Sequence, residues 1–392
     1  FDQEFKKTGH VNAYFPLFIP KSFLNKEADH VEGFAKECAI VTHSRLKTNE
    51  DGKLIPDPES QLEEEVIVRP TSETIIWSMY KKWIKSHRDL PILINQWANV
   101  VRWEMRTRLF LRTSEFLWQE GHTAHATEKE AMDETLKILN IYQSVIENSM
   151  AIPVITGKKS ENEKFAGAEN TYTMEAMMGD KKALQAGTSH YLGQNFSKAF
   201  DVKYQDIDNT EKYVYATSWG VSTRLIGALI MVHGDDKGLR LPPNIAPIQL
   251  VIIPIYKSGE DYKKIKQYVK PIITGCTNKN ITYYFDDRDK LSPGFKFNEW
   301  EMKGVPLRVE VGMRDVESQE IVMARRDTSA KSAYQYNNII LKIESELNDI
   351  QNKLFEEALR FKNINTHTVD NYEEFKKTIN NKGGFIQCFW DG

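Results

Sequence analysis

The chain has 392 residues, of which 41% are hydrophobic and 27% are charged, a composition typical of a folded protein with two or three domains. Its formal net charge of −3 excludes a protein that attracts nucleic acid through its overall field, so an RNA or DNA partner requires local basic patches. The three cysteines (Cys38, Cys276 and Cys388) are too far apart in sequence to predict a disulfide framework or a cysteine-rich zinc site.

The chain contains no apolar run near the ~20 residues that a membrane-spanning helix requires, and it opens without a signal-peptide pattern. We therefore expect no membrane partner and a cytoplasmic protein. Residues 1–9 have the pattern of the end of an amphipathic helix, so we expect the natural protein to begin upstream of Phe1.

The first region, residues 1–240, mixes strand and helix patterns and is rich in Trp, His and Arg. We interpret the polar stretch 47–65 as a surface loop, because it combines Gly52 with two prolines and a run of acids. The clearest helix is 127–150, since Thr127 and Glu130 form a capping box before apolar residues at helical spacing. Its predicted apolar face consists of Met132, Leu136, Leu139, Tyr142, Ile146 and Met150.

The segment Leu241-Pro242-Pro243 interrupts regular structure and predicts a domain hinge. Beyond it, strand and helix patterns alternate, which predicts a small α/β domain at 241–362. The expected strands are 248–255, 281–285, 307–311 and 320–324, and the expected helices are 261–269, 297–302 and 336–360. Residues 363–392 predict the start of a C-terminal domain, with a strand at 385–389.

An arginine-rich hairpin pattern lies between residues 99 and 120. Arg102 and Glu104 are two residues apart on a predicted strand, where they form either a structural ion pair or part of a ligand site. Arg112 follows in the loop, and Phe116 lies on the returning strand. Two arginines beside an aromatic ring can hold a phosphate and a carboxylate together and can stack an adenine.

Two further segments have both a binding and a structural interpretation. The segment Gly220–Arg224 predicts a glycine-started turn before a helix, which suits nucleotide phosphates but also suits ordinary packing at a helix start. Thr71 and Glu73 precede a predicted helix, so they either bind a ligand or cap that helix.

Taken together, these segments resemble the three signature motifs of class II aminoacyl-tRNA synthetases. Asn12–Pro20 is similar to the end of motif 1, Arg102-x-Glu104 with Arg112 to motif 2, and Gly220-x-Ser222-x-Arg224 to motif 3. In order and spacing they resemble the prolyl-tRNA synthetase family. Other blocks similar to that family are Gly33–Ala35, Arg69–Glu73, Trp118–His122, Gly187–His190, Leu241–Pro243, Pro293–Phe297 and Lys303–Pro306.

The resemblance implies an α/β protein in which an α+β catalytic domain, built on an antiparallel sheet, is followed by an α/β anticodon-binding domain. It implies that ATP and Mg²⁺ activate L-proline to prolyl-adenylate, that the prolyl group passes to tRNA(Pro), and that motif 1 forms a homodimer. About 65 residues separate His122 from Gly187, too few for the editing insertion of bacterial family members. In this respect the chain resembles the eukaryotic and archaeal type, and we expect no hydrolytic editing.

The resemblance also assigns substrate sites. Arg102, Glu104 and Arg224 are the expected catalytic residues, with Arg102 bridging the α-phosphate and the proline carboxylate. The ATP site is Arg102, Glu104, Arg112, Thr113, Phe116, Gln185, Thr188, Ser222 and Arg224, and Gln185 is also the expected Mg²⁺ ligand. The proline site is Phe34, Thr71, Glu73, Arg102, Trp118, Glu120, His122 and His190, in which Thr71 and Glu73 accept the two ammonium protons.

In the second domain, Phe297, Glu301 and Arg308 match positions that meet the two guanines of proline anticodons. Their chemistry suits guanine, because arginine can bind O6 and N7, a carboxylate can accept from N1 and N2, and phenylalanine can stack on the base. Arg314, Arg325, Arg326 and Lys331 either contact the RNA backbone or form a solvated charged face.

Alternatives remain open at this point. His122 and His125 suggest a zinc site like that of threonyl-tRNA synthetases, but no cysteine lies near Thr71–Glu73 to complete it, so no zinc is expected. A class II synthetase for threonine, histidine or glycine, and a non-catalytic synthetase-like RNA-binding protein, are the competing hypotheses. Pyrophosphate exchange that depends on one amino acid separates all of them.

Overall fold

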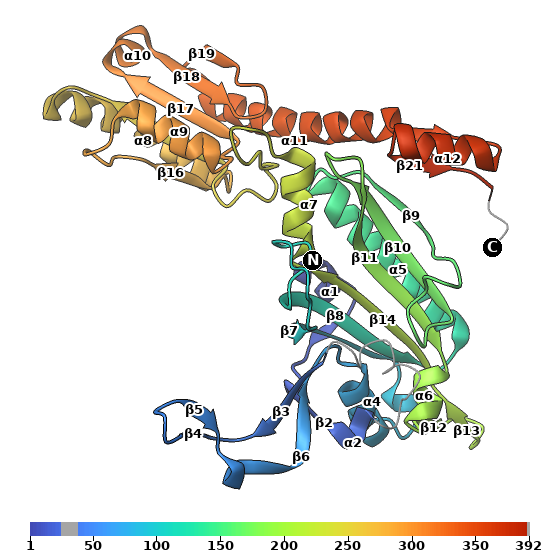
Figure 1. Ribbon diagram of the computed structural model, residues 1–392. Coiled ribbons are helices and arrows are strands. Elements are labelled where there is room, and N and C mark those ends of the chain that lie inside the picture. The colour runs from blue at the N-terminus through green and yellow to red at the C-terminus, as the bar shows by residue number, and fades with distance from the viewer. Residues whose placement is uncertain (25–37, 390–392) are drawn as a thin grey trace.

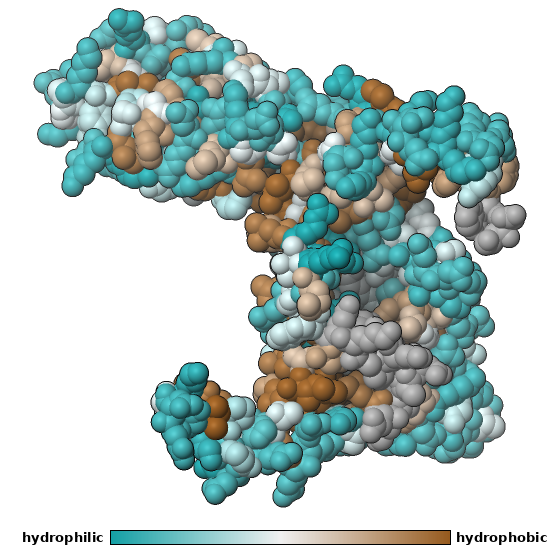
Figure 2. All heavy atoms as spheres, viewed as in Figure 1, coloured by the Kyte–Doolittle hydropathy of each residue, from teal (hydrophilic) through white to brown (hydrophobic). Residues whose placement is uncertain are grey.

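The computed structural model describes residues 1–24 and 38–389. Phe34, predicted in the proline site, and the block Gly33–Ala35 lie outside the described residues. In Figure 1 the two main domains lie one above the other, and a β-sheet arm projects from the bottom of the lower one, so that one side of the molecule is hollowed. The space-filling view in Figure 2 shows the same concave side.

The lower, first domain is built on a sheet that has seven strands within the described residues. All neighbouring strands are antiparallel except the edge pair β1–β7, so the predicted antiparallel sheet is confirmed with one parallel edge. The spatial order is β1 (Val11–Asn12), β7 (Ile92–Val101), β8 (Glu115–His125), β14 (Tyr215–Ser222), β11 (Ala183–Gly193), β10 (Asn170–Met177) and β9 (Val154–Lys158).

Helix α5 (Glu128–Asn148) covers one face of this sheet and contacts β8, β11 and β14. It begins with the predicted capping box, in which Thr127 accepts from the backbone N–H of Glu130. The predicted apolar face is wrong at Leu136, which is exposed, because Thr135 and Ile138 point toward the sheet instead. Short helix α1 (Asp2–Lys7) packs against the same core through Phe5.

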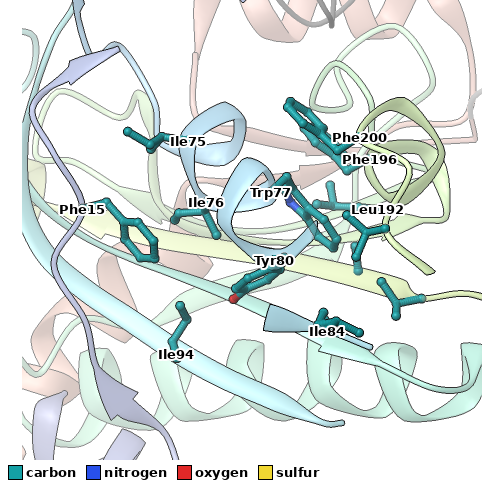
Figure 3. Packing of buried hydrophobic residues seen from close by; sticks show 14 of the residues in the cluster. Phe15, Ile75, Ile76, Trp77, Tyr80, Ile84, Ile94, Leu192, Phe196 and Phe200 are labelled. Atoms are coloured by element: carbon teal, nitrogen blue, oxygen red, sulfur yellow. The ribbon is translucent and has the colours of Figure 1, made fainter. Parts of the chain in front are cut away.

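The opposite face of the sheet is covered by α4 (Glu73–Trp83), together with the short helices α2 (Lys21–Leu24) and α6 (Asn195–Ala199). Figure 3 shows Trp77 and Tyr80 of α4 between the sheet residue Ile94 and the aromatic ring of Phe196. Large apolar side chains at helical spacing give α4 this buried face. Its first residue, Glu73, is thereby fixed relative to the sheet.

The stretch 47–65, predicted as a loop, is largely β-structure, and that prediction is wrong. A hairpin of β4 (Leu46–Thr48) and β5 (Leu54–Pro56) turns at Gly52 and forms the end of the arm in Figure 1. The single turn η2 (Pro58–Ser60) leads into β6 (Gln61–Val68), which pairs with β2 (Phe18–Pro20) and β3 (Ala39–His43). Strands with so little buried surface leave only a weak apolar pattern in the sequence.

The first domain is completed by peripheral elements and by the helix that leads out of it. The single turn η3 (His87–Asp89) follows α4, and a small hairpin is formed by β12 (Lys203–Gln205) and β13 (Glu211–Tyr213). Helix α7 (Arg224–His233) follows β14 directly and connects to the second domain.

The upper, second domain contains a mixed five-stranded sheet among the described residues. Alternate residues of β15 face opposite cores, since Leu250 packs toward α8 and α11 whereas Val251 packs against Trp300 of α9. The order is β16 (Tyr283–Phe285), β15 (Leu250–Ile255), β17 (Leu307–Gly312), β18 (Glu320–Arg325) and β19 (Lys331–Gln335). The helices are α8 (Gly259–Asn278), α9 (Pro293–Met302), α10 (Met313–Ser318) and α11 (Ile339–Ile364).

Backbone hydrogen bonds connect the segment between the two domains to the second domain. After α7, Leu239 donates its N–H to the carbonyl of Met302 at 3.0 Å, and Leu241 donates to Gly304 at 3.2 Å. Beyond α11 the chain forms β20 (Thr366–Thr368), α12 (Tyr372–Asn381) and β21 (Phe385–Gln387), so the predicted final strand is present but shorter. No helix of the described residues is long and apolar enough to cross a membrane.

Candidate active site

Two adjoining cavities open on the face of the seven-stranded sheet that carries α4. The larger, of about 260 Å³, lies over β8, β10, β11 and β14 and reaches the turn before α4. The smaller, of about 170 Å³, lies at the loop between β7 and β8. Arg102, Phe116, Ser222 and Arg224 line both cavities, which therefore form one cleft with two compartments.

Every described residue that the sequence assigned to catalysis, proline or ATP lines this cleft. The larger compartment holds Thr71, Glu73, Arg102, Phe116, Trp118, Glu120, His122, Gln185, Thr188, His190, Ser222 and Arg224. The smaller holds Arg102, Glu104, Phe116, Arg112, Thr113, Ser222 and Arg224. Residues more than 150 positions apart in the chain are thus brought to one site.

Arg102 lies where the two compartments meet. It follows the last residue of β7, so the predicted placement of Arg102 and Glu104 on one strand face is wrong, because both lie in the hairpin loop. Its Nε donates to the carbonyl of Pro70 at 3.0 Å, and its guanidinium lies 5.5 Å from the ring centre of Phe116. Glu104 instead pairs with Arg112 across the loop at 3.2 Å.

Arg224 is the first residue of α7, at the end of β14. Gly220 and Ser222 belong to that strand, so the predicted glycine-started turn is absent and the chain passes from strand to helix through Thr223. The Arg224 Nε donates to the carbonyl of Leu111 at 3.1 Å, which ties motif 3 to the hairpin loop. Burial, and next the charge of Arg112, lower the pKa of Arg224, although an arginine remains charged at any physiological pH.

Thr71 and Glu73 form one end of the larger compartment. Both side chains are buried, and the Thr71 hydroxyl donates to the Glu73 carboxylate. The N-cap residue of α4 is Ser72, and no side chain makes a capping hydrogen bond there. Glu73 is the acidic residue of the first turn of α4, where it suits the helix dipole, and both Thr71 and Glu73 also line the larger compartment.

Aromatic and imidazole rings form the walls of the same compartment. Trp118 lies on β8, and His190 of β11 is 3.0 Å from the Thr171 hydroxyl through Nδ1. The ring of Phe165 lies 4.6 Å from that of His190. The sequence did not single out Phe165, which lies in the loop between β9 and β10, where neither strand nor helix periodicity marks a buried face. Further lining residues missed from the sequence are Lys159, Glu163, Thr171 and Ser218.

His122 and His125 lie on opposite faces of β8. His122 lines the cleft, with its Nε2 2.8 Å from the Glu120 carboxylate. The His125 Nε2 is 2.7 Å from the Thr123 hydroxyl on the α5 side, where burial lowers the pKa of His125 to about 4. Residues three apart on a strand point in opposite directions, so these two histidines cannot bind one common ion.

The second domain has a cavity of its own, of about 240 Å³, beside α9 and β17. Glu301 and Arg308 line it, and Lys237 from the interdomain segment lies 3.1 Å from Glu301. The Arg308 guanidinium lies 4.4 Å from the ring centre of Phe297 and its Nε donates to Glu310 at 3.1 Å. The three predicted anticodon residues are thus neighbours.

Of the four residues considered as contacts to the RNA backbone, Arg325 and Arg326 form ion pairs within the protein. Arg326 is buried and donates to both carboxylate oxygens of Asp235, at 2.8 and 2.5 Å, across the domain junction. Arg325 pairs with Asp327, Glu346 and Asp349. Both arginines connect elements of the protein. They do not lie on a solvated charged face, and their guanidinium groups are paired with carboxylates rather than available to RNA.

Comparison with protein families agrees with this division into two sites. Residues 57–233 match the tRNA synthetase class II core domain (G, H, P, S and T), and residues 249–346 match the anticodon binding domain. The fold and the cleft therefore define a class II aminoacyl-tRNA synthetase.

Relatives with high sequence identity show which family within this class the chain belongs to. The chain is 59% identical to the proline--tRNA ligase of Cytophaga hutchinsonii over 392 residues, all of this chain and 80% of that protein. It is 59% identical to that of Flavobacterium psychrophilum, with 80% of the relative covered, and 60% identical to that of Azobacteroides pseudotrichonymphae, with 79% covered. The chain belongs to the proline--tRNA ligase family. These relatives are bacterial and do not show the eukaryotic or archaeal type expected from the short connection.

Proposed function

We propose that the cleft condenses L-proline with ATP to form prolyl-adenylate and pyrophosphate, and that the chain then transfers the prolyl group to tRNA(Pro). The observation that supports this most directly is the position of Arg102 between two compartments. One compartment ends at Thr71 and Glu73, and the other is bounded by Phe116 and Arg224. A cation at their junction suits a reaction that joins two anions.

In the larger compartment, the Thr71 hydroxyl and the Glu73 carboxylate accept the two protons of the proline ammonium group. The Glu73 charge balances the ammonium charge in a buried site, where such a pair is strong. Trp118, His122 and His190 enclose the pyrrolidine ring, and Phe165 belongs with them because it packs on His190. Phe34, whose position is not described, stays a prediction for the same wall.

In the smaller compartment, Phe116 and Arg224 stack on the two faces of adenine, and Glu104 accepts from the adenine amino group. Arg112 and Thr113 contact the nucleotide, and Ser222 lies toward the ribose. A proline carboxylate oxygen attacks the α-phosphorus while the bond to the pyrophosphate oxygen breaks. Arg102 holds the carboxylate and the α-phosphate in line and offsets their mutual repulsion.

Gln185 and Thr188 line the larger compartment, and we assign them to the phosphates. Their amide and hydroxyl oxygens are hard donors suited to a Mg²⁺ ion that keeps most of its ligands as water and phosphate, so the residues present fit the expected Mg²⁺. When bound, Mg²⁺ stabilises the negative charge that gathers on the pyrophosphate leaving group. No group of three His, Cys, Asp or Glu residues that could hold a metal occurs in the described part of the chain.

In the second domain, we assign the reading of the two anticodon guanines to Phe297, Glu301 and Arg308. The cavity beside α9 has room for a base, and its lining combines a carboxylate with a guanidinium, the pair that recognises guanine. The Phe297 ring adds a stacking surface. Of the candidate backbone contacts, Arg314 is exposed on α10 and Lys331 is exposed on β19 beside Glu310.

We also propose a homodimer formed through motif 1. An apolar depression of about 560 Å³ is lined by residues of β7, β8 and the start of α7, together with Phe1. Trp97, Leu117 and Ile226 line it and are exposed. Burial of such a surface against a second copy is favourable, because apolar patches of this kind are uncommon on monomers. Figure 2 shows apolar atoms gathered on the concave side of the catalytic domain.

Three further proposals concern organisation and location. The domain bounds are 1–240 for catalysis, 241–362 for anticodon binding and 363–392 for the start of a C-terminal domain, supported by the end of α11 at Ile364. The eukaryotic and archaeal type is supported by the short connection from β8 to β11, which contains α5, β9, β10 and loops. A cytoplasmic location is consistent with a role in translation.

Pyrophosphate exchange tests the proposed function. The protein should exchange pyrophosphate into ATP with proline and not with threonine, histidine or glycine. Thr71→Val and Glu73→Gln should each raise KM for proline about 10- to 100-fold, as expected for loss of a buried hydrogen bond to a charged ligand. Exchange with threonine alone would replace proline as the substrate, and exchange with no amino acid would favour a non-catalytic RNA-binding protein.

A further inference from the structure

A group of buried, hydrogen-bonded polar side chains lies beneath the proline compartment. It includes two residues that have no assigned role, Gln96 on β7 and Ser72 before α4. Their side chains, like those of Glu120 and His122, are almost completely buried. Buried polar groups are costly unless they are hydrogen-bonded, so a set of four in contact is a specific arrangement.

The orientation of the Gln96 amide is fixed by the main chain. Its Oε1 accepts from the backbone N–H of Phe15 at 3.0 Å, so the NH₂ group must point the other way. Nε2 then donates to Glu120 Oε1 at 2.6 Å and to the Ser72 hydroxyl oxygen at 2.9 Å. The Ser72 hydroxyl donates to the same Glu120 oxygen at 2.5 Å.

Two donors on Oε1 leave the other Glu120 oxygen for His122. Oε2 lies 2.8 Å from the His122 Nε2, which fixes a proton on that nitrogen and holds the imidazole at the wall of the cleft. The backbone carbonyl of His122 accepts from Tyr80 of α4 at 2.8 Å. Both Glu120 oxygens therefore have protein partners, and the direct proline contact expected of Glu120 stays a prediction.

The same carboxylate joins two walls of the proline compartment. Ser72 lies between Thr71 and Glu73, whereas His122 lies on β8. Both are held to Glu120, and Gln96 anchors Glu120 to the backbone of Phe15 in the motif 1 segment. A shift of the carboxylate would move the ammonium acceptors and the imidazole wall relative to each other.

We propose that Gln96 is a positioning residue for proline recognition, acting through Glu120 on His122 and through Ser72 on the Thr71–Glu73 turn. This inference rests on the proposed proline site. The smaller, ATP compartment is lined by Arg102, Phe116 and Arg224, which are not members of this hydrogen-bonded group, so a change at Gln96 should alter the affinity for proline more than that for ATP.

Kinetics of pyrophosphate exchange test it with two substitutions. Gln96→Met keeps the size of the side chain and removes both hydrogen-bonding groups, so KM for proline should rise about 10-fold while KM for ATP stays within about twofold. Gln96→Glu replaces the donating NH₂ with an oxygen that faces Glu120. That oxygen can donate only when protonated, and a neighbouring carboxylate favours its protonation.

The pH profile of Gln96→Glu separates positioning from general packing. The titratable groups connected to this position are Glu120, His122 and, next to Ser72, Glu73. The ratio of the variant KM for proline to the wild-type KM should fall as the pH is lowered from about 8 to about 6, whereas the ratio for Gln96→Met should stay constant. A ratio for Gln96→Glu that does not change with pH would overturn the proposal.

Asn95 supplies a matched control on the same strand. It is equally buried but points to the other side, where its Nδ2 lies 3.4 Å from the carbonyl of Val11. Asn95→Ala should lower the melting temperature without changing KM for proline. If Gln96→Met folds and keeps the wild-type KM for proline while Glu73→Gln raises it, Gln96 has no positioning role. If neither substitution changes it, the proline site itself is wrongly assigned.

Discussion

Two arginines of the catalytic cleft, Arg102 and Arg224, are anchored differently from three arginines of the second domain. In the cleft, Arg102 and Arg224 each donate Nε to a backbone carbonyl, which orients the guanidinium, whereas Arg112 pairs with Glu104. In the second domain, Arg308, Arg325 and Arg326 are each paired with at least one carboxylate. A carbonyl anchor suits a site for anionic substrates, whereas a carboxylate partner reduces the charge available to RNA.

The largest expected effect tests the cleft. Arg102→Ala removes the cation between the two compartments, so proline-dependent pyrophosphate exchange should fall at least about 1000-fold. Binding of tRNA(Pro), measured by filter retention, should change less than about threefold because the second domain is untouched. Turnover at the wild-type rate would remove Arg102 from the mechanism, and loss of tRNA binding would contradict the separation of the two regions.

A substitution of Arg326 tests whether its pairing with the Asp235 carboxylate stabilises the fold. Arg326→Met should lower the free energy of unfolding by about 2 to 3 kcal/mol, at or below the low end for breaking a buried ion pair, because Asp235 is partly exposed. Urea unfolding measures this change. Exchange activity should persist in the folded variant. A variant of unchanged stability with weakened tRNA binding would restore Arg326 as an RNA contact.

Arg308 sharpens the comparison within the second domain. Arg308→Met should leave proline-dependent pyrophosphate exchange unchanged and reduce kcat/KM for charging tRNA(Pro) about 10- to 100-fold, the range for loss of a base contact. Arg314→Met, at an exposed position on α10, is the control and should reduce charging only slightly. Equal charging by wild type and Arg308→Met would count against the anticodon assignment.

The last prediction concerns the stability of the junction between the regions. His233 ends α7, its Nε2 is 2.9 Å from the carbonyl of Met150, and burial lowers its pKa to about 4. His233 is therefore protonated near pH 6.5 in the unfolded chain but only near pH 4 in the folded chain. The free energy of unfolding should fall as the pH drops through this window, because the unfolded state binds the proton first.

Urea unfolding at several pH values measures this contribution, which is on the order of 3 kcal/mol at pH 4. His233→Gln should remove about half of the decrease, since burial also lowers the pKa of His125 to about 4. Stability that does not change between pH 6.5 and 4 would show that neither histidine is held neutral by burial.

Sequence motifs predicted the cleft more accurately than they predicted the surface. The described site residues of motifs 2 and 3 all line it, because short spacings on adjacent strands leave little freedom in where side chains meet. Phe165 was missed since its contact with His190 depends on a loop whose path the sequence does not reveal. The arm at 47–65 was missed because exposed strands lack an apolar alternation.

The amino-acid sequence alone determined the elements with a local cause. The capping box at Thr127 starts α5, the apolar run of β15 marks a strand buried on both faces, and the motif residues identify the chemistry. Only the tertiary structure decided the partners of charged and buried polar groups. Arg326 pairs with Asp235 and Gln96 with Glu120 because packing brings distant strands and helices together, and no local pattern encodes those distances.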